Sequence, residues 1–285
     1  MRISRLFLSL TALALAALPL RAANDTPWQD HQGMISTRII VASDEVAGEF
    51  PGVLAGAGAG HMLLAWEATL ADGWKTYWRS PGEAGLPVRL FDGDRELDIY
   101  YPLPERFELF GLETYGYGKQ VVMPFLLPVR QGDVTLKADF MVCKEICVPF
   151  EARYQIAVDQ DRGTIVTDTR VRTWLTRVPL RADVAPGGLE IKAVRLTGMP
   201  GRQSLVVDAT ATRPLSKADM LAELDHATQF QAPQVRLLPD GRSARFVLPA
   251  MSAKKGRDLS GNRIRITLAD GRGNAIDRFF ELPAR

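Results

Sequence analysis

Alternating apolar and polar residues on both sides of two closely spaced cysteines are the strongest constraint on the fold. Before the first cysteine, across residues 134–142, the apolar side chains fall on even-numbered positions, and the same holds after the second cysteine, across residues 150–156. Because successive side chains of a strand point to opposite faces, this pattern predicts two strands with their even positions in the core. Cys143 and Cys147 are both odd-numbered, so both are expected in the solvent-facing register.

The three residues between the cysteines, 144–146, are expected to form the loop of a β-hairpin. Facing residues of paired strands have Cβ atoms about 4.5–5.5 Å apart, slightly wider than the roughly 3.5–4.5 Å of a disulfide, so a bond needs only modest adjustment. Cross-linking so short a loop stabilises a fold by roughly 2 kcal/mol in the entropic model. A small gain and an exposed position favour a disulfide that exchanges with a partner thiol over a structural one, although both interpretations stay open.

Short apolar stretches separated by Gly, Pro and Asp recur along most of the chain, and this spacing favours antiparallel sandwiches over alternating βαβ units. Strands are expected at 37–43, 61–70, 88–93, 96–103, 120–129, 133–142 and 148–158. A second set is expected at 189–196, 204–212, 234–239, 243–250, 262–270 and 275–283. The expected fold class is all-β, with a second, smaller β-sandwich following the first.

A helix is expected to connect the two sandwiches at 168–178, with Asp168 as its N-cap. Its apolar positions follow i, i+3, i+4 and i+7 spacing, which is one stripe of a helix. The stripe consists of Val171, Trp174, Leu175 and Val178. A short helical insertion is also expected at 216–224. The predicted domains are thus 35–160, a connecting helix and linker at 161–187, and 188–285.

The N-terminal residues are typical of a secretory signal peptide. Arg2 and Arg5 precede an apolar run that ends near Leu20, too short for the ~20 residues that span a bilayer. Cleavage is expected near Ala22 or Ala23, leaving an exported protein without stable membrane insertion, in a compartment that permits disulfides. The formal charge is +2, and the signal removes three arginines and no acid, so the mature chain has a charge of about −1 (2 minus 3). Such a charge gives no indication of nucleic-acid binding.

A metal site is the alternative use of the cysteine pair. Met141 shares the odd register, and soft sulfur ligands suit Cu(I), so Cys143, Cys147 and Met141 are candidate copper ligands. The chain has only three histidines, none near the pair in sequence, and no second cluster that would complete a tetrahedral zinc site.

Three motifs occur in order with plausible spacing: "GWKTYWRSPGEAGLPV" (73–88), "YPLPERFELFGLETYGYGKQVVMPFLLPV" (101–129) and "VCKEICVPFEARYQI" (142–156). Together they resemble the N-terminal periplasmic domain of the thiol:disulfide interchange protein DsbD. The resemblance is closest to relatives of the suppressor of copper sensitivity (ScsB) type, because DsbD proper has a longer spacing between its cysteines. It covers about residues 35–160 strongly and the second sandwich weakly.

The resemblance implies an immunoglobulin-like sandwich with a redox cysteine pair, Cys143 and Cys147, at one end. In that family the pair takes electrons from a membrane-embedded partner and reduces periplasmic proteins that carry disulfides. The segment "ETYGYGKQ" would correspond to the loop that caps the disulfide, so that Tyr115 or Tyr117 could shield the sulfurs. Ordinary packing beside a glycine-rich turn is the alternative for both tyrosines.

This chain stops where the family normally continues into transmembrane helices and a thioredoxin-like domain. A membrane-embedded or thioredoxin-like electron donor would then be a separate protein, and no bound cofactor is expected.

Three hypotheses therefore remain. The first is a periplasmic thiol–disulfide exchange protein with Cys143 and Cys147 as its catalytic pair. The second is a Cu(I) carrier or copper-tolerance protein. The third is a structural or adaptor protein with an incidental disulfide.

Overall fold

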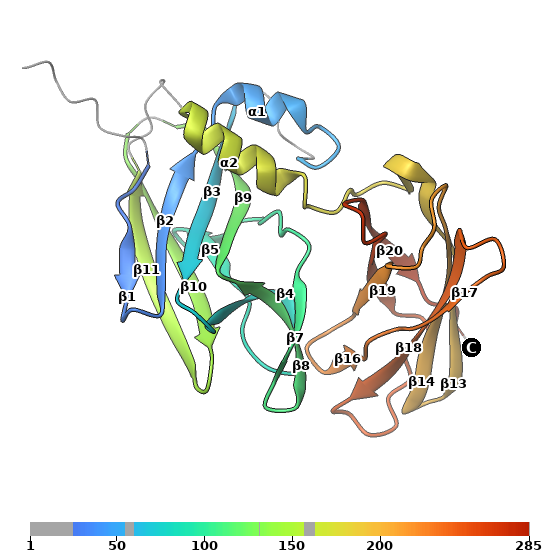
Figure 1. Ribbon diagram of the computed structural model, residues 1–285. Helices are drawn as coiled ribbons and strands as arrows, with labels where there is room; N and C mark the ends of the chain where they lie inside the picture. The colour runs from blue at the N-terminus through green and yellow to red at the C-terminus, as the bar shows by residue number, and fades with distance from the viewer. Residues whose placement is uncertain (1–24, 55–59, 131, 157–162, 285) are drawn as a thin grey trace, which may run out of the picture.

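The computed structural model describes residues 25–54, 60–130, 132–156 and 163–284. Within them the chain forms two immunoglobulin-like antiparallel β-sandwiches, joined by a helix and a short extended segment (Figure 1). The all-β fold class and the tandem arrangement predicted from the sequence are confirmed. The expected signal peptide at 1–23, with its cleavage near Ala22 or Ala23, lies outside the described residues. Neither helix of the described residues has the length and the apolar composition of a membrane span.

The first sandwich consists of a four-stranded sheet and a seven-stranded sheet. The smaller sheet has the order β1-β2-β3-β9, formed by Gln29–His31, Ile35–Val41, His61–Leu70 and Gln120–Pro128. The larger has the order β6-β5-β10-β4-β8-β7, formed by Arg95–Glu96, Arg89–Asp92, Val134–Cys143, Lys75–Gly82, Leu112–Gly118 and Glu105–Leu109. Strand β11 (Cys147–Ile156) pairs with β10. A short helix, α1 (Asp44–Glu49), follows β2.

The core of the first sandwich follows the alternation seen in the sequence. The even positions of β10 are buried, and so are Ala152, Tyr154 and Ile156 of β11. The Tyr154 hydroxyl accepts a hydrogen bond from Nε1 of Trp66 at 3.1 Å, and it lies 2.6 Å from Oγ1 of Thr37. These bonds satisfy the polar atoms that this aromatic core buries.

The second sandwich has a larger and a smaller sheet. The larger contains β12 (Val184–Ala185), β13 (Leu189–Met199), β14 (Arg202–Thr210), β18 (Ser243–Ser252), β16 (Thr228–Phe230) and β17 (Gln234–Leu237). The smaller has the order β15-β19-β20, formed by Asp219–Glu223, Arg263–Ala269 and Ala275–Glu281. A 3-10 turn, Pro186–Gly188, follows β12. The apolar inner faces of the two sheets form a separate core.

The connecting helix is present, but it begins earlier than predicted. Helix α2 spans Ile165–Leu175, and its N-cap is Thr164, which forms a reciprocal capping box with Thr167. Asp168 is therefore not the cap. Its carboxylate instead accepts hydrogen bonds from the backbone N–H and the hydroxyl of Ser43, both at 2.8 Å. Two residues of the predicted stripe, Val171 and Leu175, are fully buried, Trp174 is partly buried, and Val178 lies beyond the helix.

The helix predicted at 216–224 is wrong, because the structure has strand β15 there. Met220 is buried in the core of the second sandwich, whereas its neighbour Leu221 is buried in the core of the first. Two adjacent apolar residues with opposite directions are compatible with a strand that lies between two cores. When only the sequence is known, the spacing of these apolar residues resembles one face of a helix.

Strand content also differs around the first and second sequence motifs. The strand predicted at 96–103 is reduced to β6 and an isolated bridge between Ile99 and Phe125. Conversely, β4, β7 and β8 form where the sequence predicted no strands. Two of these, β7 and β8, pair as a hairpin that is central to the site described next.

Candidate redox site

The two cysteines form a disulfide at the end of the β10–β11 hairpin. Cys143 and Cys147 are the last facing pair of the two strands, with Cα atoms 4.2 Å apart. The Lys144 backbone N–H donates to the Ile146 carbonyl at 3.1 Å, which closes the loop between them. The bridge thus joins neighbouring strands at the edge of the molecule rather than distant parts of the core.

The two cysteines are unequally exposed, which corrects the expectation that both face solvent. Cys147 is exposed, but Cys143 is only 1% exposed. Both occupy the odd register, yet the outer face of β10 is covered at this end. Strand β4 pairs with the end of β10, with Lys75 facing Cys143, and the β7–β8 hairpin packs over it. One sulfur-bearing residue is open to a partner, and the other is protected.

Cys143 belongs to a small apolar cluster separate from the main core. Its buried members are Tyr77, Leu109 and Cys143, and the partly buried Phe107 and Met141 pack against them. Phe107 and Leu109 come from β7, so we call Glu105–Gly118 (β7 and β8) the cap hairpin. The sequence signal for it is an alternation of apolar residues around the Phe110–Gly111 turn, where both residues have positive φ (55° and 78°), as a type I′ hairpin turn requires.

Two glycines allow the cap hairpin to lie close to β4. A Cβ on Gly116 would be 2.0 Å from the Thr76 carbonyl oxygen, and one on Gly82 would be 2.5 Å from the Glu113 carbonyl oxygen. Because backbone atoms cannot move aside as the end of a side chain can, only glycine fits at these positions. The glycine of "ETYGYGKQ" at position 116 thus has a specific structural role, which is to allow β8 to pair beside Tyr77.

Tyr115 and Tyr117 are both buried in the main core cluster of the first sandwich, not in the cluster around Cys143. The Tyr117 hydroxyl donates to the Pro102 carbonyl at 2.7 Å. The Tyr115 hydroxyl bonds to Glu113 and to Phe230 of the second sandwich (3.4 Å). Shielding of the sulfurs by either tyrosine stays a prediction. Three residues that pack around Cys143 were not identified as site residues from the sequence: Tyr77, Phe107 and Leu109.

Tyr77 closes the buried side of the cluster. Its ring lies against Gly85, where a Cβ would be 2.3 Å from the ring, and its hydroxyl has no hydrogen-bond partner among the described residues. Burial raises the pKa of Tyr77 to about 12. The surroundings of Cys143 are therefore apolar, and they disfavour a charged sulfur.

Cationic and sulfur-containing side chains surround the edge of the site. Lys75 Nζ lies 4.1 Å from the centroid of the Phe107 ring, and Lys144 Nζ donates to the Asp72 carbonyl at 3.3 Å. Met141 is partly buried beside Cys143, so the three candidate copper ligands lie in one region.

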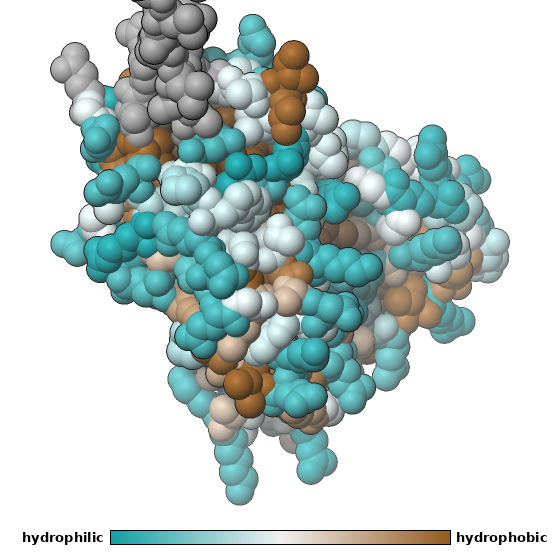
Figure 2. Space-filling view, turned by 60° about the vertical axis from the view of Figure 1, so that its left-hand side comes forward, coloured by the Kyte–Doolittle hydropathy of each residue, from teal (hydrophilic) through white to brown (hydrophobic). Residues whose placement is uncertain are grey.

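Hydrophobic side chains are exposed at the two hairpin tips. Phe110 is 67% exposed, Ile146 is 60% exposed, and Leu112 is also exposed. The space-filling view shows hydrophobic side chains among hydrophilic ones at the lower end of the first sandwich, where the hairpin tips lie (Figure 2). Apolar residues beside an exposed cysteine are suited to contact with another protein.

Comparisons with known proteins agree with the resemblance seen in the sequence. Residues 54–159, which include both cysteines, match the family model described as thiol:disulfide interchange protein DsbD, N-terminal. Residues 177–277 match a domain of unknown function (DUF8393). The crystal structure of the N-terminal periplasmic domain of ScsB from Proteus mirabilis has a TM-score of 0.73 and 18% sequence identity, covering 93% of this chain and 100% of that one. The likeness thus extends over both sandwiches. No match was found among curated protein sequences.

Proposed function

We propose that this chain is a periplasmic thiol–disulfide exchange protein that carries electrons on the Cys143–Cys147 pair. The main support is the position of the disulfide: it lies at a hairpin tip, with one exposed cysteine and one beneath the cap hairpin. The match of residues 54–159 to the family model described as thiol:disulfide interchange protein DsbD, N-terminal, supports the same reaction class, and the likeness to the ScsB domain supports the same fold. A cross-link between already paired strands contributes little stability, so exchange explains the pair better than a structural role.

Because Cys147 is the exposed cysteine, it is the one that a partner attacks first. A partner thiolate attacks Sγ of Cys147, the disulfide breaks, and Cys143 leaves as a thiolate that takes a proton from water. A second partner thiolate then attacks the partner's sulfur in the mixed disulfide, which releases Cys147 reduced and leaves a disulfide on the partner. Two electrons thereby pass to this chain, and the reverse steps deliver them to the disulfide of an acceptor.

The cap hairpin controls how readily Cys143 leaves as a thiolate when the disulfide breaks. While Phe107, Leu109 and Tyr77 surround Cys143, an anionic sulfur would form in an apolar cluster, which is unfavourable. Movement of the hairpin admits water and stabilises the thiolate. Exchange is therefore slow in the closed protein and fast when a partner displaces the cap. Candidate partners are a membrane-embedded or thioredoxin-like electron donor and periplasmic proteins that carry disulfides.

The reduction potential of the pair tests this proposal. Equilibration of the mature protein in dithiothreitol or glutathione buffers should give a value of about −180 to −270 mV, in the range of exchange proteins. A value below about −300 mV, typical of structural disulfides, would contradict the proposal. A Cys143→Ser variant should form stable mixed disulfides through Cys147, whereas Cys147→Ser, the matched control, should form far fewer.

A Cu(I) site is the second candidate, favoured by the packing of Met141 against the Cys143 cluster. Titration of the reduced protein in the presence of a competing chelator should then show one bound Cu(I), weakened by Met141→Leu and lost with Cys143→Ser. The adaptor hypothesis instead predicts that a double Cys→Ser variant keeps its partner binding and cellular phenotype.

A further inference from the structure

One face of strand β15 makes several of the contacts between the second sandwich and the first. Asp219, Leu221 and Glu223 alternate along this strand and therefore point the same way. Leu221 is 6% exposed and belongs to the core cluster of the first sandwich. Glu223 forms a bidentate ion pair with Arg79 of β4, at 2.6–3.1 Å. Asp219 pairs with Arg106, which lies in the cap hairpin itself.

The Arg106 side chain joins the two strands of the cap hairpin to the second sandwich. Its Nε and Nη2 atoms donate to the two carboxylate oxygens of Asp219 at 2.7 and 3.0 Å, and Nη2 also donates to the Met220 carbonyl at 2.7 Å. Its Nη1 atom donates to Glu113 and, at 3.0 Å, to the Tyr115 hydroxyl, both on β8. A guanidinium has five N–H groups, and this arrangement occupies them all. One side chain therefore fixes both strands of the cap hairpin to β15.

The partners of Arg106 favour its charged form. Burial disfavours the cation, but the hydrogen bond and charge of Asp219, with Tyr115 and Glu113, outweigh burial and raise the pKa of Arg106. A bidentate arginine–carboxylate pair also restricts the direction of both side chains. The Arg106–Asp219 contact is thus suited to fixing the position of the cap hairpin relative to β15, as well as to attracting the two oppositely charged side chains.

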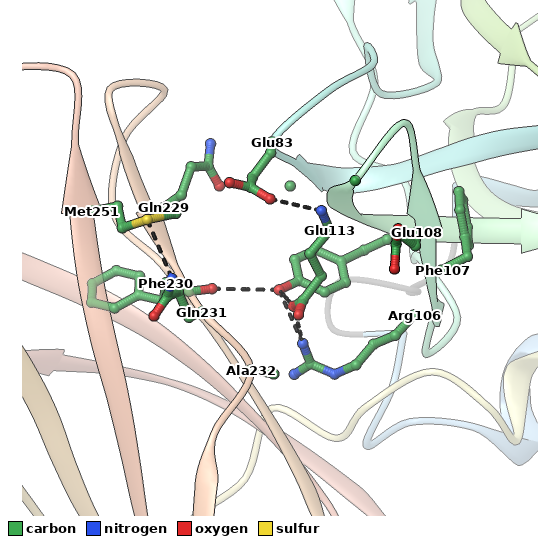
Figure 3. Close-up of a pocket in the computed structure, with 13 residues that line it drawn as sticks. Glu83, Arg106, Phe107, Glu108, Glu113, Gln229, Phe230, Gln231, Ala232 and Met251 are labelled. Carbon is green, nitrogen blue, oxygen red and sulfur yellow. Dashed lines mark hydrogen bonds and ion pairs between the residues drawn. The ribbon is translucent and has the colours of Figure 1, made fainter. Parts of the chain in front are cut away.

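Beside these contacts the tip of the cap hairpin, residues 107–112, faces a cavity, whereas Tyr115 further along β8 reaches the second sandwich through its bond to the Phe230 carbonyl at 3.4 Å. A cavity of about 530 Å³ separates Phe107, Glu108 and Gly111 from Phe230, Gln231 and Met251 (Figure 3). In Figure 1 the hairpin lies between the cysteine hairpin and the second sandwich. The cavity provides space into which the tip of the cap hairpin can move when it leaves Cys143, while β8 stays paired with β4. The polar contacts of Arg106 thus help to determine the position of the tip.

We propose that Arg106 and Asp219 are positioning residues that keep the cap hairpin closed over Cys143, and that the second sandwich thereby sets the rate of disulfide exchange. The biological role of this control rests on the proposed function, but the rate of disulfide reduction itself can be measured with any small thiol. Neither residue touches the sulfurs. Both act through Phe107 and Leu109, which follow Arg106 on β7.

The test measures the rate at which dithiothreitol reduces the disulfide in the full chain. Asp219→Asn, which is nearly isosteric, should raise this rate roughly tenfold, equivalent to about 1.4 kcal/mol. Arg106→Lys should act similarly, because a lysine cannot make the bidentate contact. The double variant should be little faster than either single variant, since both changes remove the same interaction. The reduction potential should stay unchanged, because the cap alters the rate in both directions.

Two control variants separate positioning of the cap from general loosening. Glu223→Gln weakens the other ion pair of the same β15 face, with Arg79, which is outside the cap hairpin. Asp208→Asn removes a charge within the second sandwich, where Asp208 pairs with Arg195 and Arg245. Both controls should reduce at the wild-type rate. Urea unfolding and near-ultraviolet circular dichroism establish that each variant is folded.

Two results would overturn the proposal: a wild-type reduction rate in folded Asp219→Asn and Arg106→Lys, or an equal acceleration in Glu223→Gln. Failure of the proposed function is distinguishable, because it would abolish exchange with partner proteins in every variant while leaving the order of the dithiothreitol rates intact.

Discussion

Truncation of Leu109 is expected to accelerate reduction of the disulfide strongly. Leu109 is buried against Tyr77 and Cys143, and it comes from the cap hairpin. Leu109→Ala removes three carbons from this contact, and at about 0.8 kcal/mol per buried methylene the loss is about 2 kcal/mol after allowance for residual exposure. If opening of the hairpin exposes this side chain, the open form becomes about 30-fold more populated, since 1.4 kcal/mol corresponds to a factor of ten.

The assay follows reduction by dithiothreitol, with the free thiols trapped by a maleimide at timed intervals. Leu112→Ala is the matched control, because Leu112 faces Leu109 across the hairpin but is exposed and lies outside the Cys143 cluster. We expect the Leu109→Ala rate to rise about 30-fold and the Leu112→Ala rate to stay within about twofold of wild type. A rate for Leu109→Ala within threefold of wild type would refute the argument, because reduction would then proceed through Cys147 without opening of the cap.

Three further predictions concern stability, each measured by urea unfolding. Tyr77→Phe should stabilise the protein by about 1 kcal/mol, because it removes a buried hydroxyl without a partner among the described residues; a loss of stability would indicate that the hydroxyl is satisfied. Gly116→Ala should destabilise by about 3 kcal/mol through collision with the Thr76 carbonyl, whereas Gly118→Ala, with open space around it, should be nearly neutral. Burial lowers the pKa of His31 below its usual 6.5, so the unfolded state takes up a proton first and stability should decline as the pH falls below about 6.5. A His31→Gln variant should show a flatter profile between pH 8 and 5, and an identical slope in both proteins would contradict the assignment.

Much of the fold follows from local pattern. Alternation over residues 134–142 and 150–156 determined which faces of β10 and β11 are buried, and it placed Cys143 opposite Cys147. The i, i+3, i+4 spacing of Val171, Trp174 and Leu175 located the connecting helix. Its start was missed, because the side chains of Thr164 and Thr167 cap it before the apolar stripe begins. Patterns of this kind depend on near neighbours in the chain, and the sequence displays them directly.

The identity of the cysteine pair was also available from the sequence, but the environment of each cysteine was not. Cys143 is buried because Phe107 and Leu109, more than thirty residues earlier, cover the outer face of β10. The alternation along a strand predicts to which face a side chain points, but not which other residues cover that face. The helix predicted in place of strand β15 was wrong for the same reason, since Met220 and Leu221 are buried in two different cores.

The sequence by itself therefore determined the two sandwiches, the hairpin and the disulfide partners. Only the tertiary structure decided that one cysteine is protected and the other exposed, and that Arg106 joins the protecting hairpin to the second sandwich. The physical reason is that burial and ion pairing arise from segments far apart in the chain. Arg106 and Asp219 are separated by 113 residues, and no local periodicity indicates that they meet.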